Sequence, residues 1–379
     1  MREADIPRFN IEQVTSPDVR NLRTNTPNYF IELIELGFLE NVSSIRDVAP
    51  GSMVAMNGLS NASYFFRDNR SPRVVKFGHF SATAEARMLN LLREKQVSVP
   101  QVLGSGIVPS TEGKGKPVEY IVLEGIEKDG QPAPTGYGYL EKQQDQETAI
   151  DQAWILGECM ADELVKVHNV APDDMVIGGV LDTPDGTAET IYDYFTKKID
   201  DPGSTNLLNS LGIDINRMKA AFETTQFPET GSMVFGDFLP YNVVVESESP
   251  SLTIKILDPT PSTNDPYWDI ARFVNTFDLT EALTRDHPKN QEYSDKLEQE
   301  KHLRDGFLGR YVVQAGELDP KRLLANQIIF AVGHIQRREA RADTIGSAGL
   351  AQIPFEKERV VDLMKELLKE YIAEFMELT

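Results

Sequence analysis

The spacing of hydrophobic positions changes along this chain and separates a strand-rich first third from a helical remainder. Residues 26–40 open with the pair Thr26-Pro27 and have apolar side chains on one helical face, so they predict a helix. Between residues 53 and 125, short apolar runs alternate with Gly, Ser and Asn turns, which is typical of strands. One helical pattern interrupts them at about residues 81–95. We therefore expect the first 125 residues to form mostly a sheet that carries one prominent helix.

The segment after Gly125 is rich in Gly and Pro and is typical of a linker, and helical patterns dominate the chain beyond it. These patterns predict two lobes in an α+β chain. Residues 1–125 form a small β-rich N-lobe with an N-terminal helical extension, and residues 126–379 form a larger, mainly helical C-lobe. A cleft between two such lobes is a common place for a ligand. The expected helices of the second lobe cover residues 148–169, 188–199, 214–224, 266–284, 295–314 and 319–337, with the strands VVVES and LTIKIL between them.

The last segment, EKERVVDLMKELLKEYIAEFMEL, has an apolar stripe along one helical face. Such a stripe usually packs into a core, and a dimer seam is the alternative. The sequence therefore leaves open whether the protein is a monomer or a homodimer. The stripe consists of Val360, Leu363, Met364, Leu367, Leu368, Tyr371, Ile372 and Phe375.

Charge narrows the range of partners. The chain has 379 residues, of which 38 are Lys or Arg and 59 are Asp or Glu, and its formal charge is −21. An acidic surface of this kind repels nucleic acid and anionic lipid, and it attracts metal ions and amine-bearing substrates. Solubility alone is the simpler explanation of the charge. We expect no nucleic-acid partner.

The compartment follows from what the sequence lacks. Cys159 is the only cysteine, so no disulfide forms within the chain, and its apolar-periodic surroundings predict a buried small hydrophobic residue and not a nucleophile. The N-terminus, MREADIPRFN, lacks the apolar core of a secretory signal. No run approaches the roughly 18 apolar residues of a transmembrane helix. We expect a cytoplasmic protein that does not enter a membrane.

The candidate chemistry lies in FGDFLPYNVVV and in LDPTPSTNDPYWDIARF, which follows it. Asp237 and Asn242 stand five residues apart before one strand, and Asp258 ends the next. They are either turn residues around a hairpin or oxygen ligands for a metal and a phosphate. Phosphoryl transfer needs Mg²⁺ on the phosphates and a carboxylate that orients the attacking hydroxyl. Asp237 can orient the hydroxyl while Asn242 and Asp258 hold Mg²⁺, which prefers oxygen ligands.

The whole segment resembles the catalytic core of the aminoglycoside phosphotransferase and choline-kinase-like family, within the protein-kinase-like fold. The resemblance implies that Asp237 is the catalytic base and that Asn242 and Asp258 bind Mg²⁺. It also implies that Asp269 is a structural acid that braces the catalytic loop. The resemblance spans residues of about 50–275, and the order of its motifs along the chain makes it specific.

Motifs in the first lobe extend the resemblance. AMNGLSNASYFFR is similar to the hairpin that covers the nucleotide, and RVVKFG to the strand that carries the ATP lysine. EARMLNLL resembles the helix whose glutamate pairs with that lysine, and YIVLEGI resembles the hinge that binds adenine. The nucleotide-binding residues implied by the resemblance are Gly58, Ser60 and Asn61 in the hairpin, the Lys76–Glu85 pair, and the backbone of Glu124 and Ile126 at the hinge.

The chain departs from the family pattern in its catalytic loop. Phe235 stands where the family usually has a histidine two residues before the catalytic aspartate, which removes one polar brace. Phe-Leu-Pro-Tyr replaces the usual run with His-Pro-Gly, and Pro-Thr-Pro follows Asp258. These differences leave the three oxygen ligands in place, but they prevent the transfer of a substrate from any one family member.

We therefore expect an ATP- and Mg²⁺-dependent phosphotransferase that acts on a hydroxyl of an antibiotic or a metabolite. The acidic composition favours an amine-bearing acceptor, and the sequence does not identify it. No segment resembles the activation loop of protein kinases after Asp258. Two alternatives stay open: use of GTP in place of ATP, and a catalytically silent kinase-fold module that binds nucleotide or a partner.

Overall fold

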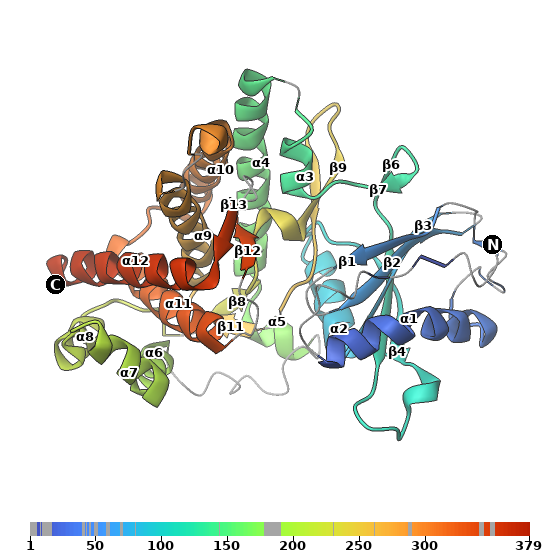
Figure 1. The fold of residues 1–379 in the computed structure, drawn as a ribbon, viewed down its shortest axis with the longest axis horizontal. Helices are drawn as coiled ribbons and strands as arrows, with labels where there is room; N and C mark the ends of the chain where they lie inside the picture. The colour runs from blue at the N-terminus through green and yellow to red at the C-terminus, as the bar shows by residue number, and fades with distance from the viewer. Residues whose placement is uncertain are drawn as a thin grey trace. The chain divides into compact units, whose positions relative to one another are not determined.

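The structure is a computed structural model, and the chain divides into two compact units (Figure 1). The first unit holds the residues up to Thr135 together with Val244–Asp258. The second holds Gly136–Ile177, residues 191–243 and Pro259–Thr379. The structure describes residues 6–7, 9, 17–39, 42, 44, 47–48, 52–57, 61–68, 71–79, 81–143, 145–177, 191–229, 231–260, 262–286, 290–340, 345–348 and 353–379.

The first unit is built on an antiparallel sheet with the strand order β1-β2-β3-β5-β4. Helix α2 begins behind Ser81, whose side chain accepts a hydrogen bond from the amide of Ala84, so the predicted helix has an N-cap. Both the sheet and this helix match the sequence prediction. The strands are β1 (Val54–Asn57), β2 (Ala62–Arg67), β3 (Pro72–Gly78), β4 (Val102–Ile107) and β5 (Glu119–Glu124), and the helices are α1 (Pro17–Glu35) and α2 (Ala82–Glu94).

Helix α1 begins earlier than the sequence predicts. It starts at Pro17, so Pro27 lies inside the helix and not at its first turn. A proline inside a helix removes one hydrogen bond, and burial of one helical face offsets that loss here. Phe30 packs against Tyr64 and Phe66 on β2, with ring centroids 5.4 and 5.2 Å apart. Tertiary packing thus overrides the helix-start signal at residues 26–27.

One face of the sheet forms the hydrophobic core of this unit with α1. Side chains alternate along a strand, so Val75 and Phe77 of β3 point into that core while Lys76 between them points to the opposite face. The core members from the sheet are Ala62, Tyr64, Phe66, Val75, Phe77, Tyr120 and Val122.

A hairpin from late in the chain belongs to the first unit. It consists of β9 (Val243–Ser247) and β10 (Thr253–Ile256). The Ile256 amide donates to the Ser98 carbonyl at 2.9 Å, and Lys255 bridges Glu124 at 2.9 Å and Glu246 at 3.0 Å. A single domain boundary after residue 125, which the sequence suggests, leaves this hairpin out of the first unit.

The second unit is mainly helical. Helices α4 and α10 approach each other closely at two glycines: a Cβ atom at Gly157 would collide with the backbone of Leu303, and one at Gly306 with the backbone of Trp154. The helices are α3 (Gly136–Leu140), α4 (Gln146–His168), α5 (Pro172–Ile177), α6 (Ile191–Asp200), α7 (Pro202–Ser210), α8 (Ile215–Glu223), α9 (Tyr267–Asp286), α10 (Asn290–Ala315), α11 (Pro320–Ala340) and α12 (Lys357–Glu377). The strand pairs are β8 (Ser232–Val234) with β11 (Ser262–Asn264), and β12 (Ile345–Ala348) with β13 (Ile353–Glu356); β6 (Glu127–Lys128) pairs with β7 (Gln131–Pro132) in the first unit.

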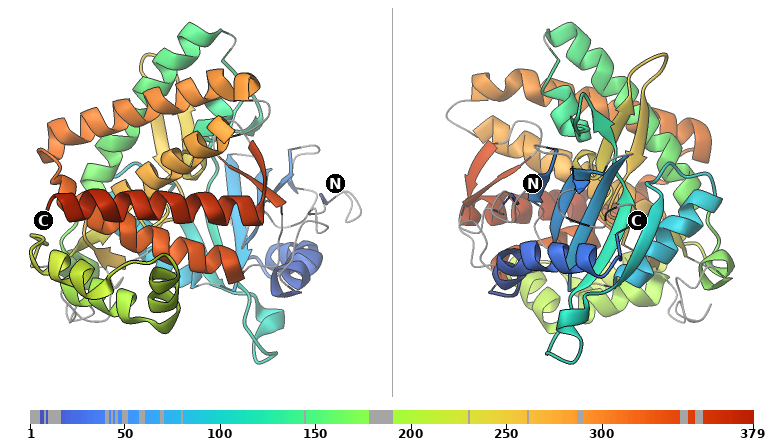
Figure 2. Two further views of the ribbon diagram at one scale, coloured as in Figure 1. Left: turned by 60° about the vertical axis from the view of Figure 1, so that its left-hand side comes forward. Right: turned by 90° about the vertical axis from the view of Figure 1, so that its right-hand side faces the viewer.

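The C-terminal stripe packs within the second unit. Helix α12 lies beside α11 and also contacts α8 and α9 (Figure 2). Of the eight stripe residues, seven are buried in this core, and Leu367 is partly buried against it. The core-packing interpretation therefore describes this helix. Among the described residues, no helix is long and apolar enough to cross a membrane.

Candidate functional site

Lys76 and Glu85 form a buried ion pair in the first unit. The Lys76 Nζ atom lies 2.9 Å from Oε1 and 3.0 Å from Oε2 of Glu85, and both side chains are 8% exposed. Strand β3 presents the lysine on the sheet face opposite to α1, and the first turn of α2 supplies the glutamate. The pairing that the family resemblance implies is thus present, and Glu94 takes no part in it.

Asp258 is the second partner of Lys76. Its Oδ1 atom accepts a hydrogen bond from Lys76 Nζ at 2.7 Å, while the carboxylate is half exposed. Burial opposes the charged form of Lys76, but Asp258 and Glu85 together outweigh burial, so the pKa of Lys76 is raised. The φ angle of Asp258 is +58°, in the left-handed region that a non-glycine residue adopts at a cost. Strain of this kind is characteristic of functional positions.

The segment after β5, where the sequence predicts the adenine-binding hinge, is held by backbone hydrogen bonds. The Glu124 amide donates to the Gln101 carbonyl at 2.8 Å, and the Gly125 amide donates to the Pro72 carbonyl at 3.0 Å. A Cβ atom at position 125 would lie 2.6 Å from the backbone nitrogen of Arg73, so only glycine fits. The Ile126 carbonyl accepts from the Ala133 amide, whereas the amide of Ile126 has no hydrogen-bond partner among the described residues. That amide is available to a ligand.

The covering hairpin is described only in part. Gly58 and Ser60 lie outside the described residues. Asn61 is partly buried and stands directly before β2. Its expected contact with phosphate remains a prediction.

The loop of the second unit that carries Asp237, the expected catalytic base, is anchored by Asp269. This fully buried carboxylate accepts the amides of Phe235 and Gly236, each at 2.7 Å, and the ring of His168 at 3.1 Å. Tyr311 bonds the other ring nitrogen of His168 at 2.9 Å, which fixes the ring. The bracing role implied for Asp269 therefore has a direct structural basis.

Phe235 leaves no polar side chain at its position in the loop. Its ring is fully buried against Phe238, with centroids 5.4 Å apart. The loop keeps its course through backbone hydrogen bonds and through Gly236, whose φ of +86° requires glycine. Phe235 is thus part of the hydrophobic core.

The Asp237 carboxylate has two close partners that the sequence reasoning missed. Its Oδ1 atom accepts a hydrogen bond from Tyr241 Oη at 2.8 Å and forms an ion pair with Arg272. The Arg272 Nη2 atom also lies 3.3 Å from Tyr241 Oη. Arg272 stands one helical turn after Asp269 on α9, and this i, i+3 spacing is the one signal that could have indicated it.

The residues expected to bind Mg²⁺ have suitable free oxygens. The Asn242 amide group donates to the Asp237 carbonyl at 2.8 Å, which orients its Oδ1 atom as the remaining ligand atom. Asp258 uses Oδ1 for Lys76, which leaves Oδ2 on its exposed carboxylate. Asn242 and Asp258 belong to different units, so their joint coordination of Mg²⁺ remains a prediction. Within the described part of the chain, no group of three His, Cys, Asp or Glu residues is arranged to hold a metal.

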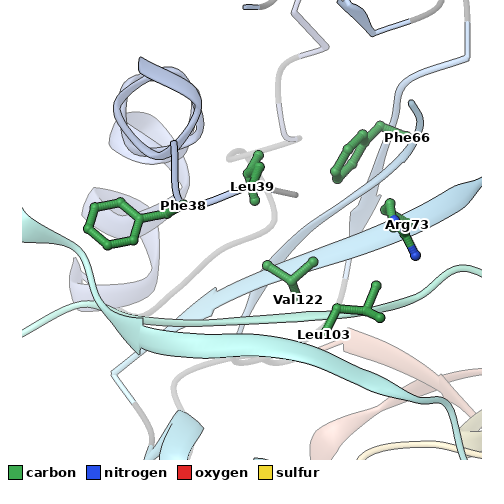
Figure 3. A pocket seen from close by; sticks show the side chains of 6 residues that line it. All are labelled: Phe38, Leu39, Phe66, Arg73, Leu103 and Val122. Carbon is green, nitrogen blue, oxygen red and sulfur yellow. The ribbon is translucent and has the colours of Figure 1, made fainter. Parts of the chain in front are cut away.

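A small pocket in the first unit is separate from these residues (Figure 3). Arg73 and Val122 lie on the α1-facing side of the sheet, opposite to Lys76. No candidate nucleotide-binding residue lines the pocket, so we assign no nucleotide to it. Its lining consists of Phe38, Leu39, Phe66, Arg73, Leu103 and Val122.

Solved structures resemble this chain at low sequence identity. Aminoglycoside phosphotransferase APH(4)-Ia is 12% identical with a TM-score of 0.56, over 90% of this chain and 97% of that chain. A thermostable mutant of it, in a ternary complex with AMP-PNP and hygromycin B, is 13% identical with a TM-score of 0.56, over 90% and 98% of the two chains. The microcompartment-associated aminopropanol kinase is 14% identical with a TM-score of 0.53, over 91% and 98%.

No family model matches the chain, and no curated protein matches it significantly. Identities of 12–14% establish the fold alone. The protein has the α+β fold of the aminoglycoside phosphotransferase and aminopropanol kinase structures, with a small antiparallel sheet and a larger, mainly helical part. The resemblance seen in the sequence is confirmed at the level of fold.

Proposed function

We propose that this protein is a small-molecule kinase that transfers the γ-phosphoryl group of ATP to a hydroxyl. The observation that carries the proposal is the buried Lys76–Glu85 pair with Asp258 on the same ammonium. A lysine held in this way is a fixed cation for nucleotide phosphates. The kinase-like fold and the anchored loop around Asp237 support the same function.

The roles follow from the chemistry of the side chains. Lys76 binds the phosphates, and the Ile126 amide hydrogen-bonds adenine. Asp237 orients the acceptor hydroxyl in line with the γ-phosphorus. Asn242 and Asp258 hold Mg²⁺, which when bound neutralises the phosphate charge that develops during transfer. Gly58, Ser60 and Asn61 cover the phosphates, and the backbone of Glu124 completes the hinge.

The acceptor belongs to a broad chemical class. A net charge of −21 favours a cationic, amine-bearing alcohol by long-range attraction. Two of the structures with this fold are described as an aminopropanol kinase and as a phosphotransferase bound to hygromycin B. We therefore propose an amino alcohol or an aminated sugar as the first class of acceptors to screen, in a cytoplasmic setting.

The test is a thermal-shift titration of ATP and GTP, each with and without Mg²⁺. A ligand at about 100 times its dissociation constant stabilises the folded state by roughly 2.7 kcal/mol. We expect stabilisation by Mg²⁺ and ATP in the wild type and its loss in Asp258→Ala. Glu112→Ala, at an exposed acid of the same unit, is the matched control and should behave as the wild type.

The transfer step needs a second measurement. Wild-type protein should phosphorylate amine-bearing alcohols in a screen that follows ADP release, and Asp237→Asn should do so with a strongly reduced but measurable kcat. Nucleotide-dependent stabilisation without transfer to any acceptor or to water would favour the silent binding module. No stabilisation by either nucleotide would refute the kinase proposal.

A further inference from the structure

Two donors converge on one oxygen of the Asp237 carboxylate. Tyr241 Oη and Arg272 Nη2 both reach Oδ1, whereas Oδ2 receives no hydrogen bond from the described residues. The Tyr241 side chain is 43% exposed, but local desolvation of its hydroxyl, more than the neighbouring charges, raises its pKa to about 12. The hydroxyl therefore remains protonated at neutral pH and donates to the carboxylate. The arrangement leaves Oδ2 as the oxygen that can accept a proton from a further hydroxyl.

Arg272 is itself held in place. Its guanidinium lies over the ring of Phe330 on α11 at 5.2 Å, and its side chain is only 18% exposed. An arginine packed on an aromatic face has lost most of its freedom, so it can fix a partner without further ordering.

The first turns of α9 therefore restrain the catalytic loop twice. Asp269 binds the two amides that precede Asp237, and Arg272, three residues further on, binds the Asp237 side chain. Both residues lie on one face of the helix because positions i and i+3 are neighbours. The backbone of the loop and the carboxylate of Asp237 are thus both held by helix α9.

We propose that Arg272 is a positioning residue that fixes the carboxylate of Asp237 so that Oδ2 faces the acceptor hydroxyl. This rests on the proposed kinase function. In that reaction the acceptor oxygen bonds to the γ-phosphorus, the bond from the γ-phosphorus to the bridging oxygen breaks to release ADP, and the hydroxyl proton passes to Oδ2. Arg272 makes no contact with the reacting atoms and acts through Asp237. Phe235, buried among aromatic rings, gives the loop no such polar support from its own side chain.

The test compares steady-state kinetics of Arg272→Gln, Arg272→Lys and Tyr241→Phe, with ATP hydrolysis by water as the assay so that no acceptor need be known. Misplacement of a reacting group by about 1 Å can cost on the order of 10²-fold in rate, and we expect a loss of kcat of that order in Arg272→Gln. KM for ATP should stay within about twofold, because uniform binding is not affected. Arg272→Lys, which keeps the charge, should recover part of kcat. Arg285→Gln, in the last turn of the same helix, is the matched control and should behave as the wild type.

A double-mutant cycle with Asp237→Asn separates positioning from a general structural role. If Arg272 acts through Asp237, Arg272→Gln should cause no further loss of kcat in the Asp237→Asn background. A wild-type kcat in Arg272→Gln, or an equal further loss in both backgrounds, would overturn the proposal while leaving the kinase function intact. Wild-type protein that binds Mg²⁺ and ATP but turns over neither water nor any acceptor would overturn both.

Discussion

Replacement of Lys76 by methionine should destabilise the first unit strongly. The substitution keeps the length of the side chain but leaves the Glu85 carboxylate, 8% exposed, without its cation. Removal of one partner of a buried ion pair typically costs about 3–5 kcal/mol. Asp258 is half exposed and can be rehydrated, so we expect the lower end, about 3 kcal/mol. At about 2–4 °C per kcal/mol, the melting temperature should fall by about 6–12 °C.

A second substitution distinguishes loss of the pair from a general packing defect. Lys76→Met combined with Glu85→Leu replaces both charges by apolar side chains, and such replacements of a buried pair are often neutral or stabilising. We expect the double variant to recover to within about 1.5 kcal/mol of the wild type. Neither variant should be stabilised by Mg²⁺ and ATP, because both lack the cation that we propose to bind the phosphates.

Circular dichroism and differential scanning fluorimetry, with chemical denaturation for the free energy, measure these changes. Glu112→Leu, at an exposed position of the same unit, controls for the effect of an added apolar side chain. The reasoning would be refuted by a Lys76→Met variant as stable as the wild type. It would also be refuted if the double variant were as unstable as the single one.

Three further outcomes are expected. Burial raises the pKa of Tyr64 and Tyr371, and the pKa of Lys76 is raised from 10.5, so the folded state holds these protons more tightly than the unfolded state. Their contribution to stability should be complete below about pH 10 and should decrease as the pH rises above it. Urea unfolding between pH 8 and 11.5 measures this change. The Cys159 side chain is only partly buried, whereas the sequence predicts a buried one, and desolvation together with nearby acids raises the pKa of its thiol to about 11. The thiol should therefore react slowly with a disulfide reagent at pH 8 and much faster in denaturant, and fast reaction of the native protein would contradict the raised pKa. Gly236→Ala should cost more than the roughly 1–2 kcal/mol of a left-handed alanine, because its Cβ atom would lie 3.1 Å from Thr260, whereas Gly316→Ala, with a φ of +93° and open space, should cost no more than that strain.

The sequence predicted those features that follow from local hydrophobic patterns and from the order of motifs along the chain. The hydrophobic periods located the sheet, helix α2 and most of the later helices, and the sequence of motifs pointed to the Lys76–Glu85 pair that the structure contains. Prediction failed where distant segments decide the outcome. The true start of α1 at Pro17 depends on its packing against β2, and the membership of the β9–β10 hairpin in the first unit depends on Ser98 and Lys255.

The partners of the Asp237 carboxylate could not be predicted from the sequence for the same reason. Arg272 lies 35 positions away, and apart from its i, i+3 spacing to Asp269 nothing in its local pattern separates it from a surface arginine on an amphipathic helix. Only the folded loop brings the two together. The left-handed backbone of Asp258 was equally hidden, because aspartate adopts many conformations in turns.

The charge balance around Lys76 predicts that nucleotide binding depends strictly on magnesium. One ammonium and two carboxylates give this cluster a net charge of −1, and the whole chain carries −21. A nucleotide triphosphate without a metal would therefore meet an environment that repels it, despite the lysine. We expect a divalent cation held by Asp258 to reverse the sign of the cluster, so that Lys76 would be able to face phosphate instead of the carboxylate. ATP alone should thus give little thermal stabilisation. Asp258→Ala, which removes one of the two acids, should increase the small stabilisation by metal-free ATP and should abolish the additional stabilisation by Mg²⁺. Stabilisation by ATP in excess EDTA equal to that with Mg²⁺ would contradict this account of the site.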